Sequence, residues 1–341
     1  MAQIAEEAGL SRFTVSKILR GDVSVRPKNR EKVLALCEKY GFVPNSNAVN
    51  LVSGTTSIIG MIVPYITDGF YAELIEFTEN YASRRGMDLI YRSSYNNAET
   101  EEKVVRSFMG LNIAALLIVP VVENADRRIL RLAAANFPVI CLDRTVPGDF
   151  CSVLNDNRES CRIMTEHLLD RRDEVYFLDS FYRGSNPTSL ARRFGYLDAV
   201  TARGLEPRFI PLRVSGERQD NERYGYEHIA AFLGDNARPP AALVCVTDAV
   251  ALGAMRALRD AGFLPGRDTL VGGHDNLRFF EYTTPALSSM AQPKQEMARI
   301  AVDMALARLQ APETPPEHIV LRSRLVVRDS SGRRPVGSGK R

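Results

Sequence analysis

The sequence has few of the residues that build disulfide frameworks and metal centres. Its five cysteines are odd in number, scattered, and without a CxxC pair. Its four histidines form no cluster with the spacing of metal ligands. A disulfide framework and a metal site are therefore not expected, and the cysteines read as buried thiols of a reducing compartment.

Membrane segments and catalytic motifs are also missing. No apolar run reaches the roughly 20 residues that a membrane-spanning helix needs, and no signal peptide precedes the first predicted helix. We therefore expect a cytoplasmic protein with no membrane partner. The chain has no P-loop, no GxGxxG after a strand, no GxSxG and no HExxH. No catalytic residues, no cofactor and no enzymatic activity are expected.

The excess of positive charge is small but unevenly placed. Residues 1–54 hold eight basic and five acidic side chains, whereas the remaining 287 residues hold 36 of each sign. The net charge of +3 therefore lies in the amino-terminal segment, where a polyanionic partner would need it. The length of 341 residues predicts more than one domain.

Residues 4–21 have the pattern of two short helices joined by a tight turn. Gly9 suits the left-handed conformation that ends a helix, and Ser11 suits the cap of the next one. Val15, Ile18 and Leu19 form an apolar face on the second helix. The opposite face carries Arg12, Phe13, Ser16, Lys17 and Arg20. The pattern predicts a helix-turn-helix that reads a major groove, with an ordinary basic helical hairpin as the alternative.

A third helix is predicted to begin at Pro27 and to end at Gly41. Its expected core face consists of Val33, Leu34, Cys37 and Tyr40. Three helices of this size predict a compact domain over residues 1–44.

Residues 45–56 predict a linker with about two turns of helix that Asn45 would cap. Ala48, Leu51 and Val52 lie on one side of this helix. So short a helix is not stable alone, because helix nucleation is unfavourable. It is either a plain linker or a helix that forms only on binding.

From residue 57 onward, apolar runs typical of buried parallel strands alternate with amphipathic helices. The predicted strands are 58–64, 88–93, 115–120, 138–143, 151–156, 175–179, 208–213, 241–248 and 269–275. The predicted helices are 70–85, 99–109, 126–135, 158–170, 188–203, 220–233 and 248–261.

This alternation predicts an α/β core over residues 57–328 with two doubly wound parallel-sheet subdomains. They span roughly 57–156 and 157–280, with the C-terminal segments crossing back. A ligand is expected outside the carboxyl ends of the strands. Residues 329–341 are rich in Gly, Ser, Pro and Arg and predict a disordered tail.

Several motifs resemble, in the right order, the lactose-repressor/galactose-repressor (LacI/GalR) family of bacterial transcription regulators. They are AEEAGLSRFTVSKILRG, YGFVPNSNAVNLVSG, SIIGMIVP…FYAELI, PVICLDR, ARRFGYLDAV, CVTDAVALGAMRAL and GGHDN…TTPALSSMAQP. The likeness covers about residues 3–327. It departs from the family pattern at Arg26, where a serine cap is usual, and at Asp68-Gly69, where Asn-Pro is common.

The resemblance implies a fold and a function. The fold is an all-α helix-turn-helix head followed by an α/β core similar to periplasmic sugar-binding proteins. The function is that of a sequence-specific DNA-binding regulator, a repressor, which a small sugar-like effector between the two subdomains controls. The family acts as a homodimer, which requires a near-palindromic operator on double-stranded DNA.

The resemblance also implies which residues contact DNA. Arg12, Phe13, Ser16 and Lys17 would face the major groove, where Arg12 and Lys17 either read guanine or contact only phosphate. Thr14 contacts phosphate or caps the helix locally, and Arg20 has similar reach. Leu51 would wedge into the minor groove from the linker helix that also carries Asn45 and Ala48, or pack as a hinge leucine on its dimer mate.

Effector contacts are implied at the ends of several strands. Phe70 and Tyr71 would line the wall, Asp143 and Asp275 would accept from ligand hydroxyls, and Arg192 would donate from the second subdomain. Secondary candidates are Asp220, Thr247, Asp248 and Gln292. Arg144 either binds the ligand or pairs with Asp143, and Asp248 either binds the ligand or only caps the helix that it begins.

The chemical class of the effector stays open at this point. The carboxylates favour a sugar or polyol, whereas Arg192 and Arg144 suit a sugar acid or a sugar phosphate equally well. Two other kinds of protein remain as alternatives. One is a solute-binding protein without a DNA role, which the basic head disfavours. The other is a sugar-acting α/β enzyme, which the missing motifs disfavour.

Overall fold

The structure is a computed structural model of the chain. It describes residues 1–19, 24–42, 56–122, 131–132, 135–148, 150–179, 186–211 and 220–332. These divide into two compact units, Met1–Ser57 and Ile58–Arg341, each with a hydrophobic core of its own. No helix in the described ranges combines the length and the apolar content that crossing a membrane requires.

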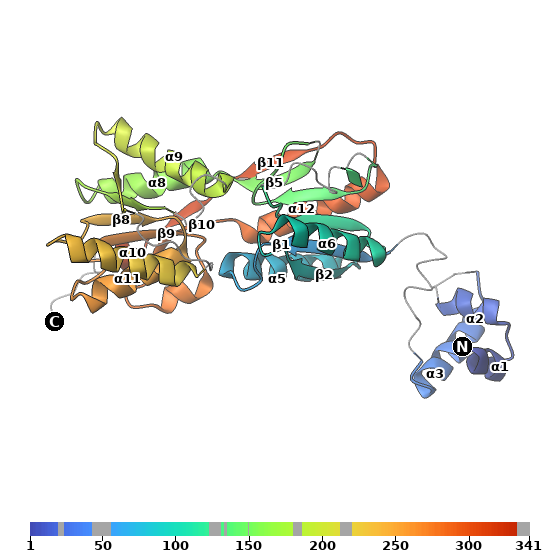
Figure 1. The fold of residues 1–341 in the computed structure, drawn as a ribbon. Helices are drawn as coiled ribbons and strands as arrows, with labels where there is room; N and C mark the ends of the chain where they lie inside the picture. The colour runs from blue at the N-terminus through green and yellow to red at the C-terminus, as the bar shows by residue number, and fades with distance from the viewer. Residues whose placement is uncertain are drawn as a thin grey trace, which may run out of the picture. The chain divides into compact units, whose positions relative to one another are not determined.

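The first unit contains three short helices, α1 (Ala2–Ala8), α2 (Arg12–Leu19) and α3 (Pro27–Lys39) (Figure 1). The predicted turn is confirmed, since Gly9 has a φ of 69° and the amide of Thr14 donates to Ser11 Oγ at 3.0 Å. The buried core includes Ile4, Val15, Ile18, Val33 and Leu36, so all three helices contribute to it.

The core face of α3 differs from the prediction. Val33 and Cys37 are buried as expected, but Leu34 and Tyr40 are 51% and 39% exposed, and Leu36 is buried in their place. Residues three and four apart share a helical face, so Leu36 and Cys37 lie beside Val33 whereas Leu34 turns away. Tyr40 follows the last helical residue, and its hydroxyl donates to Glu7 of α1.

The second unit has two lobes, each built on a six-stranded sheet (Figure 1). The sheet of the first lobe is parallel throughout, with the order β11-β5-β4-β3-β1-β2. Its strands are β1 (Ile58–Val63), β2 (Asp88–Ser93), β3 (Ala115–Ile118), β4 (Val139–Leu142), β5 (Cys151–Asn155) and β11 (His318–Leu321). Its helices are α5 (Gly69–Arg84), α6 (Ala98–Gly110) and α12 (Lys294–Gln310).

The sheet of the second lobe has the order β12-β10-β9-β8-β6-β7, and only β12 runs antiparallel. Its strands are β6 (Tyr176–Leu178), β7 (Arg208–Phe209), β8 (Ala242–Cys245), β9 (Leu270–His274), β10 (Ser288–Ala291) and β12 (Arg324–Val326). Helices α8 (Asn157–Leu169) and α9 (Pro187–Ala202) cover one face, and α10 (Asn221–Asp235) and α11 (Asp248–Asp260) cover the other (Figure 1). The two predicted doubly wound sheets are therefore confirmed.

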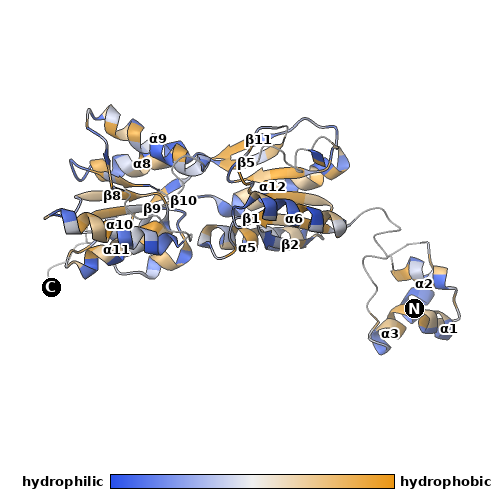
Figure 2. Ribbon diagram, in the orientation of Figure 1, coloured by the Kyte–Doolittle hydropathy of each residue, from blue (hydrophilic) through white to orange (hydrophobic). Residues whose placement is uncertain are grey.

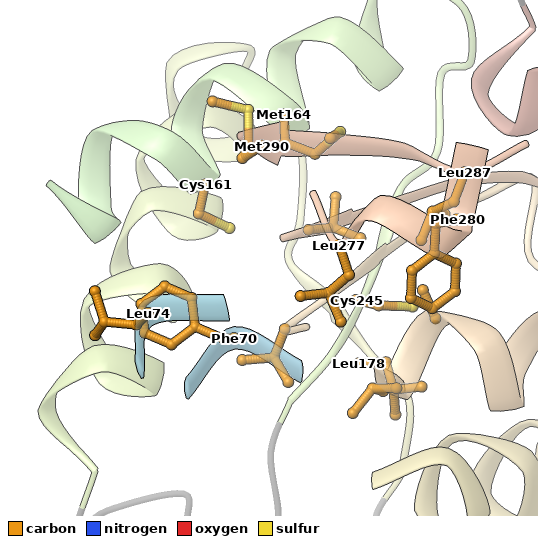
Figure 3. Packing of buried hydrophobic residues seen from close by; sticks show 14 of the residues in the cluster. Phe70, Leu74, Cys161, Met164, Leu178, Cys245, Leu277, Phe280, Leu287 and Met290 are labelled. Atoms are coloured by element: carbon orange, nitrogen blue, oxygen red, sulfur yellow. The ribbon is translucent and has the colours of Figure 1, made fainter. Parts of the chain in front are cut away.

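The chain passes between the lobes after β5, after β10 and again between β11 and β12. Strands β3, β4, β8 and β9 are buried at every position, as expected for strands covered on both faces. The strands inside each sheet are accordingly coloured as hydrophobic residues in Figure 2. One buried cluster includes residues of both lobes, among them Phe70 and Leu74 of α5 and Leu277, Phe280 and Leu287 (Figure 3).

The predicted start of the disordered tail is wrong. Asp329–Ser331 form the 3-10 turn η2, which follows Arg328 directly, and Ser330 and Ser331 are buried. Ser330 Oγ donates to the carbonyl of Val271 at 2.6 Å, so these small polar residues bond to the second lobe. Residues 45–55 of the predicted linker 45–56, most of the predicted helix 126–135 and residues 333–341 lie outside the described residues.

Candidate functional site: a cleft between two lobes

A cavity of about 100 Å³ lies between the lobes of the second unit. Its walls are loops at the carboxyl ends of the strands and the first turns of α5, α9 and α10, where doubly wound sheets bind ligands. Eight of the ten residues predicted to bind an effector line it. They are Phe70, Tyr71, Asp143, Arg144, Arg192, Thr247, Asp275 and Gln292.

Tyr71, Asp143 and Arg144 form the wall on the first lobe. The Tyr71 hydroxyl donates to Asp143 Oδ2 at 3.0 Å, and Arg144 Nη2 donates to Asn96 Oδ1 at 2.9 Å. Burial raises the pKa of Asp143 above its ordinary value, although Arg144 and Arg192 act in the opposite direction. The alternative of an Arg144–Asp143 ion pair is not what the described residues show, because Arg144 bonds to Asn96 instead. Its buried Nε has no partner.

Asp275, Arg192 and Gln292 form the opposing wall on the second lobe. Asp275 Oδ1 accepts from Gln292 Nε2 at 2.6 Å and from Arg192 Nη2 at 3.5 Å. The other two guanidinium nitrogens of Arg192 donate to Asn157 Oδ1 at 2.9 Å and to the carbonyl of Val246 at 2.6 Å. Arg192 is therefore held in place on three sides, and it fixes one oxygen of Asp275.

A lysine of the first lobe donates a hydrogen bond to the backbone of Asp275. Lys294, at the start of α12, is 6% exposed and donates from Nζ to the backbone carbonyl of Asp275 at 2.7 Å. The same Nζ lies 2.7 Å from Glu73 Oε2 of α5 and 6.0 Å from the Phe70 ring centroid. The loop that carries Asp275 is thus tied to both lobes.

The backbone at the site is held in unusual conformations. Asp143 has a φ of 62°, Asp275 a φ of 109° and Asn96 a φ of 51°. Residues other than glycine rarely adopt a positive φ. The backbone strain of such a conformation persists where the surrounding structure enforces it, often at ligand sites. Three polar residues of the cavity lining therefore occupy conformations that folding alone does not favour.

Asp248 takes neither of its two predicted roles. The cap of α11 is Thr247, whose hydroxyl accepts from the amide of Val250, and Asp248 is not part of the cavity lining. Its fully buried carboxylate accepts from Ser289 Oγ at 2.6 Å and from the amide of Leu277 at 3.0 Å. Because Leu277 follows Asp275 closely, Asp248 supports the loop that carries the binding carboxylate.

Asp220 is placed differently from the expectation, whereas Phe70 lines the cavity as predicted but with little of its surface. Asp220 caps α10 by accepting from the amide of Arg223, and it lines a neighbouring cavity of about 300 Å³. Phe70 is 5% exposed and stands edge-on to Tyr71, with ring centroids 5.2 Å apart, so most of its surface packs in the core (Figure 3).

Several lining residues were not among the named effector contacts, although three of them belong to the strand-end segment 64–71 where a ligand was expected. They are Pro64, Tyr65, Asp68, Asn96, Asn186, Thr188, Ser189, Asn221 and Val246. Asn186 precedes Pro187 and caps α9, and an Asn-Pro pair is a readable sign of a helix start at a strand end. Asp68 belongs to this strand-end segment and departs from the family pattern. It caps α5 by accepting from the amide of Phe70 at 2.9 Å.

The predicted DNA-contacting residues of α2 lie on its outer face. Arg12 is exposed, and Phe13 is 66% exposed with the Lys17 ammonium 5.5 Å from its ring centroid. The Thr14 hydroxyl shares a hydrogen bond with that of Ser11, which supports local capping. Ser16 is half-buried on the same helix. Arg20, Asn45, Ala48 and Leu51 lie outside the described residues.

Residues 1–45 match the sequence profile of bacterial regulatory proteins of the lacI family, and residues 166–331 match that of the periplasmic binding protein-like domain. The chain thus combines a lacI-type helix-turn-helix domain with a periplasmic-binding-protein-like domain. The HTH-type transcriptional regulator AscG of Escherichia coli (strain K12) is 28% identical over 335 residues, which cover 97% of each chain.

Two solved LacI-family structures resemble the fold. A lac repressor dimer bound to operator and the anti-inducer ONPF is 23% identical, with a TM-score of 0.80 over 97% of this chain and 98% of that one. A LacI-family regulator from Enterococcus faecium with bound ribose is 24% identical, with a TM-score of 0.70 over 81% of this chain and 98% of that one. The predicted fold is thereby confirmed.

Replacement of Asp68 by asparagine should change the pH dependence of stability. Desolvation raises the pKa of Asp68 from 3.8 to about 7, and the nearby charge of Asp275 adds to the effect. Folding therefore takes up a proton between about pH 4 and pH 7, and the free energy of unfolding falls as the pH rises through this interval. Asp68→Asn keeps the helix cap but cannot ionise.

The melting temperature of Asp68→Asn relative to the wild type should therefore rise between pH 5 and pH 8. Differential scanning fluorimetry of the full chain measures this difference. Asp156→Asn exchanges the cap of α8, which does not line the cavity, and serves as the matched control. A difference for Asp68→Asn that stays constant with pH would show that Asp68 ionises normally.

Proposed function

We propose that this LacI-family protein is a repressor whose affinity for a near-palindromic operator is set by a sugar-like ligand in the cleft between its lobes. The observation that carries the proposal is the combination of two units in one chain. One is a helix-turn-helix with exposed basic and aromatic side chains on α2. The other is a two-lobed core whose cavity brings buried carboxylates and guanidinium groups together.

The DNA-binding role rests on the chemistry of α2. Arg12 and Lys17 donate to guanine edges, Phe13 contacts a thymine methyl, and Ser16 offers a hydroxyl. Thr14 contacts phosphate, whereas the predicted DNA contacts Arg20, Asn45, Ala48 and Leu51 lie outside the described residues. Two copies of the chain on a two-fold symmetric site supply both half-site contacts, as in the lac repressor dimer on its operator.

The ligand-binding role rests on hydrogen-bonding groups that converge from both lobes. Asp143, Asp275 and Gln292 offer acceptor oxygens, and Arg144 offers a donor. Such a mixture suits a sugar, a sugar acid or a sugar phosphate. The E. faecium relative holds ribose, which supports a sugar-sized effector here. The protein binds this effector without turning it over, in keeping with its relatives, which are named as transcriptional regulators.

Control of the operator follows from linkage between the two sites. A ligand that prefers one arrangement of the lobes changes the population of the state that binds DNA. A coupling free energy of about 1–3 kcal/mol changes operator affinity roughly 5- to 150-fold. Lys294 and Glu73 give this coupling a physical route, because they connect the loop of Asp275 to α5 of the first lobe.

Replacement of Arg12 by alanine tests the DNA-reading helix. A base contact should be lost, so specificity should relax at one operator position at a cost of about 1–3 kcal/mol. The measurement is selection of binding sites from a random DNA library, followed by titration at fixed salt. Arg106→Ala, which removes an equal charge from α6 of the core, is the control. Uniform weakening on all sequences would assign Arg12 to phosphate contact instead.

Replacement of Asp275 by asparagine tests the cleft. The variant should still bind the selected operator but should lose its response to the sugar that shifts wild-type affinity, because the buried carboxylate can no longer accept two strong hydrogen bonds. Operator titrations with and without ligand measure the response, and Asp156→Asn is again the control. An unchanged ligand response in a normally melting Asp275→Asn protein would remove Asp275 from the site.

A further inference from the structure

A cavity of about 920 Å³ lies apart from the effector cleft. Residues of α5 and α12 form two of its walls, and the loops after β9 and β10 and the segment that joins β11 to β12 form the others. Within the described residues it shares only Gln292 with the lining of the cleft. We call this cavity the arginine groove. Its volume is in the range of small-molecule sites, roughly 300–1,000 Å³.

The lining of the arginine groove has an excess of positive charge. Its cationic residues are Arg84, Arg278, Lys294, Arg299, Arg322 and Arg324, against the two carboxylates Glu73 and Glu296. Both carboxylates are already paired. Glu73 Oε2 lies 2.7 Å from Lys294 Nζ, and Glu296 accepts two hydrogen bonds from Arg299, at 2.6 and 3.0 Å. Arg278 donates to a carboxylate outside the lining.

Three arginines carry the remaining charge. Arg84 ends α5, Arg322 lies between β11 and β12, and Arg324 begins β12. All three are exposed, and none has a hydrogen bond or an ion pair within the part of the chain that the structure describes. The fold thus places three unpaired guanidinium groups around one cavity, although their charges repel one another. An anion that reaches all three relieves this repulsion.

The chemistry of the guanidinium group favours phosphate as that anion. Each guanidinium offers parallel N–H donors in a rigid fork, which match the oxygens of a phosphate group. One phosphate monoester carries a charge of about −1.5 to −2 at pH 7, so more than one is needed to balance three guanidinium charges. The groove therefore suits a ligand with two phosphate groups.

An aromatic wall on α5 indicates that the ligand also has an organic part. Phe77 and Tyr81 line the groove, and residues four apart share one face of a helix. Both rings are partly buried and pack against the hydrophobic core. The Tyr81 hydroxyl donates to Asp303 of α12 at 3.0 Å, which fixes its ring. A ring held in this way offers an apolar surface to a ligand whose phosphates bind the arginines.

We propose that the arginine groove binds a small organic molecule with two phosphate groups, at a site separate from the effector cleft. Arg84, Arg322 and Arg324 bind the phosphates, and Phe77 and Tyr81 contact the organic part. The inference goes beyond the proposed function, because it adds a second ligand site that does not depend on what the cleft binds.

Isothermal titration of the full chain at pH 8 tests the ligand class. The probes are a hexose bisphosphate, a nucleoside diphosphate, the monophosphate of each, inorganic pyrophosphate and citrate, all at equal ionic strength. At least one organic diphosphate should bind about tenfold or more tightly than its monophosphate, pyrophosphate and citrate, because it alone meets both the arginines and the aromatic wall. The tighter of the two diphosphates identifies the organic part. Pyrophosphate or citrate binding as tightly as both diphosphates, or no binding of either diphosphate, would overturn the proposal.

A double variant tests whether the groove is the site. Arg322→Gln combined with Arg324→Gln should weaken binding of the tighter diphosphate by about tenfold or more, because charge-assisted hydrogen bonds to phosphate are lost. The matched control is Arg92→Gln combined with Arg238→Gln, which removes the same charge from exposed positions outside the lining. The control should bind as the wild type does. Equal affinities of the two double variants would place the anion elsewhere and refute the assignment.

Sedimentation velocity of the same variants separates a ligand site from a contact between two copies of the chain. Arg322→Gln combined with Arg324→Gln should have the oligomeric state of the wild type. A changed oligomeric state with unchanged diphosphate binding would assign these arginines to an interface between copies and would contradict the ligand site. No DNA is present in any of these measurements, so their failure would leave the proposed control of an operator standing.

Discussion

Hydrogen bonds from both lobes hold Asp275, which lines the cleft between them. Its side chain is fixed by Gln292 and Arg192 of the second lobe, and its backbone carbonyl is fixed by Lys294 of the first. Lys294 is in turn paired with Glu73, and both are nearly buried, so neither charge is easily left alone. A ligand that bonds to Asp275 therefore acts on a residue that both lobes already hold. A shift of Asp275 changes its contact with Lys294, which is paired with Glu73 of α5.

Much of the fold and part of the site can be predicted from the sequence. Continuous apolar runs identify the buried strands, and the polar residues that end them, Asp143 and Asp275, lie in the cleft because parallel strands share one edge. Asp248 misleads because Thr247 and Asp248 are both good caps and only the structure shows which one bonds to the amide. Leu34 misleads because its helical phase differs from that of Val33 by a single residue.

What the sequence could not provide is the pairing of groups across lobes. The Lys294–Glu73 pair joins residues more than two hundred positions apart, and no local pattern marks either as part of the site. The same holds for Asp68, whose raised pKa comes from burial and from the charge of Asp275 in the other lobe. Such properties depend on how the lobes close, so the sequence indicates the candidates while the structure decides which groups remain free for a ligand.

The central claim is that the cleft and the DNA-binding head share one equilibrium, and reciprocity of binding tests it most directly. The measurement is calorimetric titration of the best-binding sugar into the full chain, first free and then saturated with its selected operator. The account predicts that operator changes the sugar dissociation constant by the same factor, roughly 5- to 150-fold, by which the sugar changes operator affinity. Equal sugar affinities in the two titrations would contradict it.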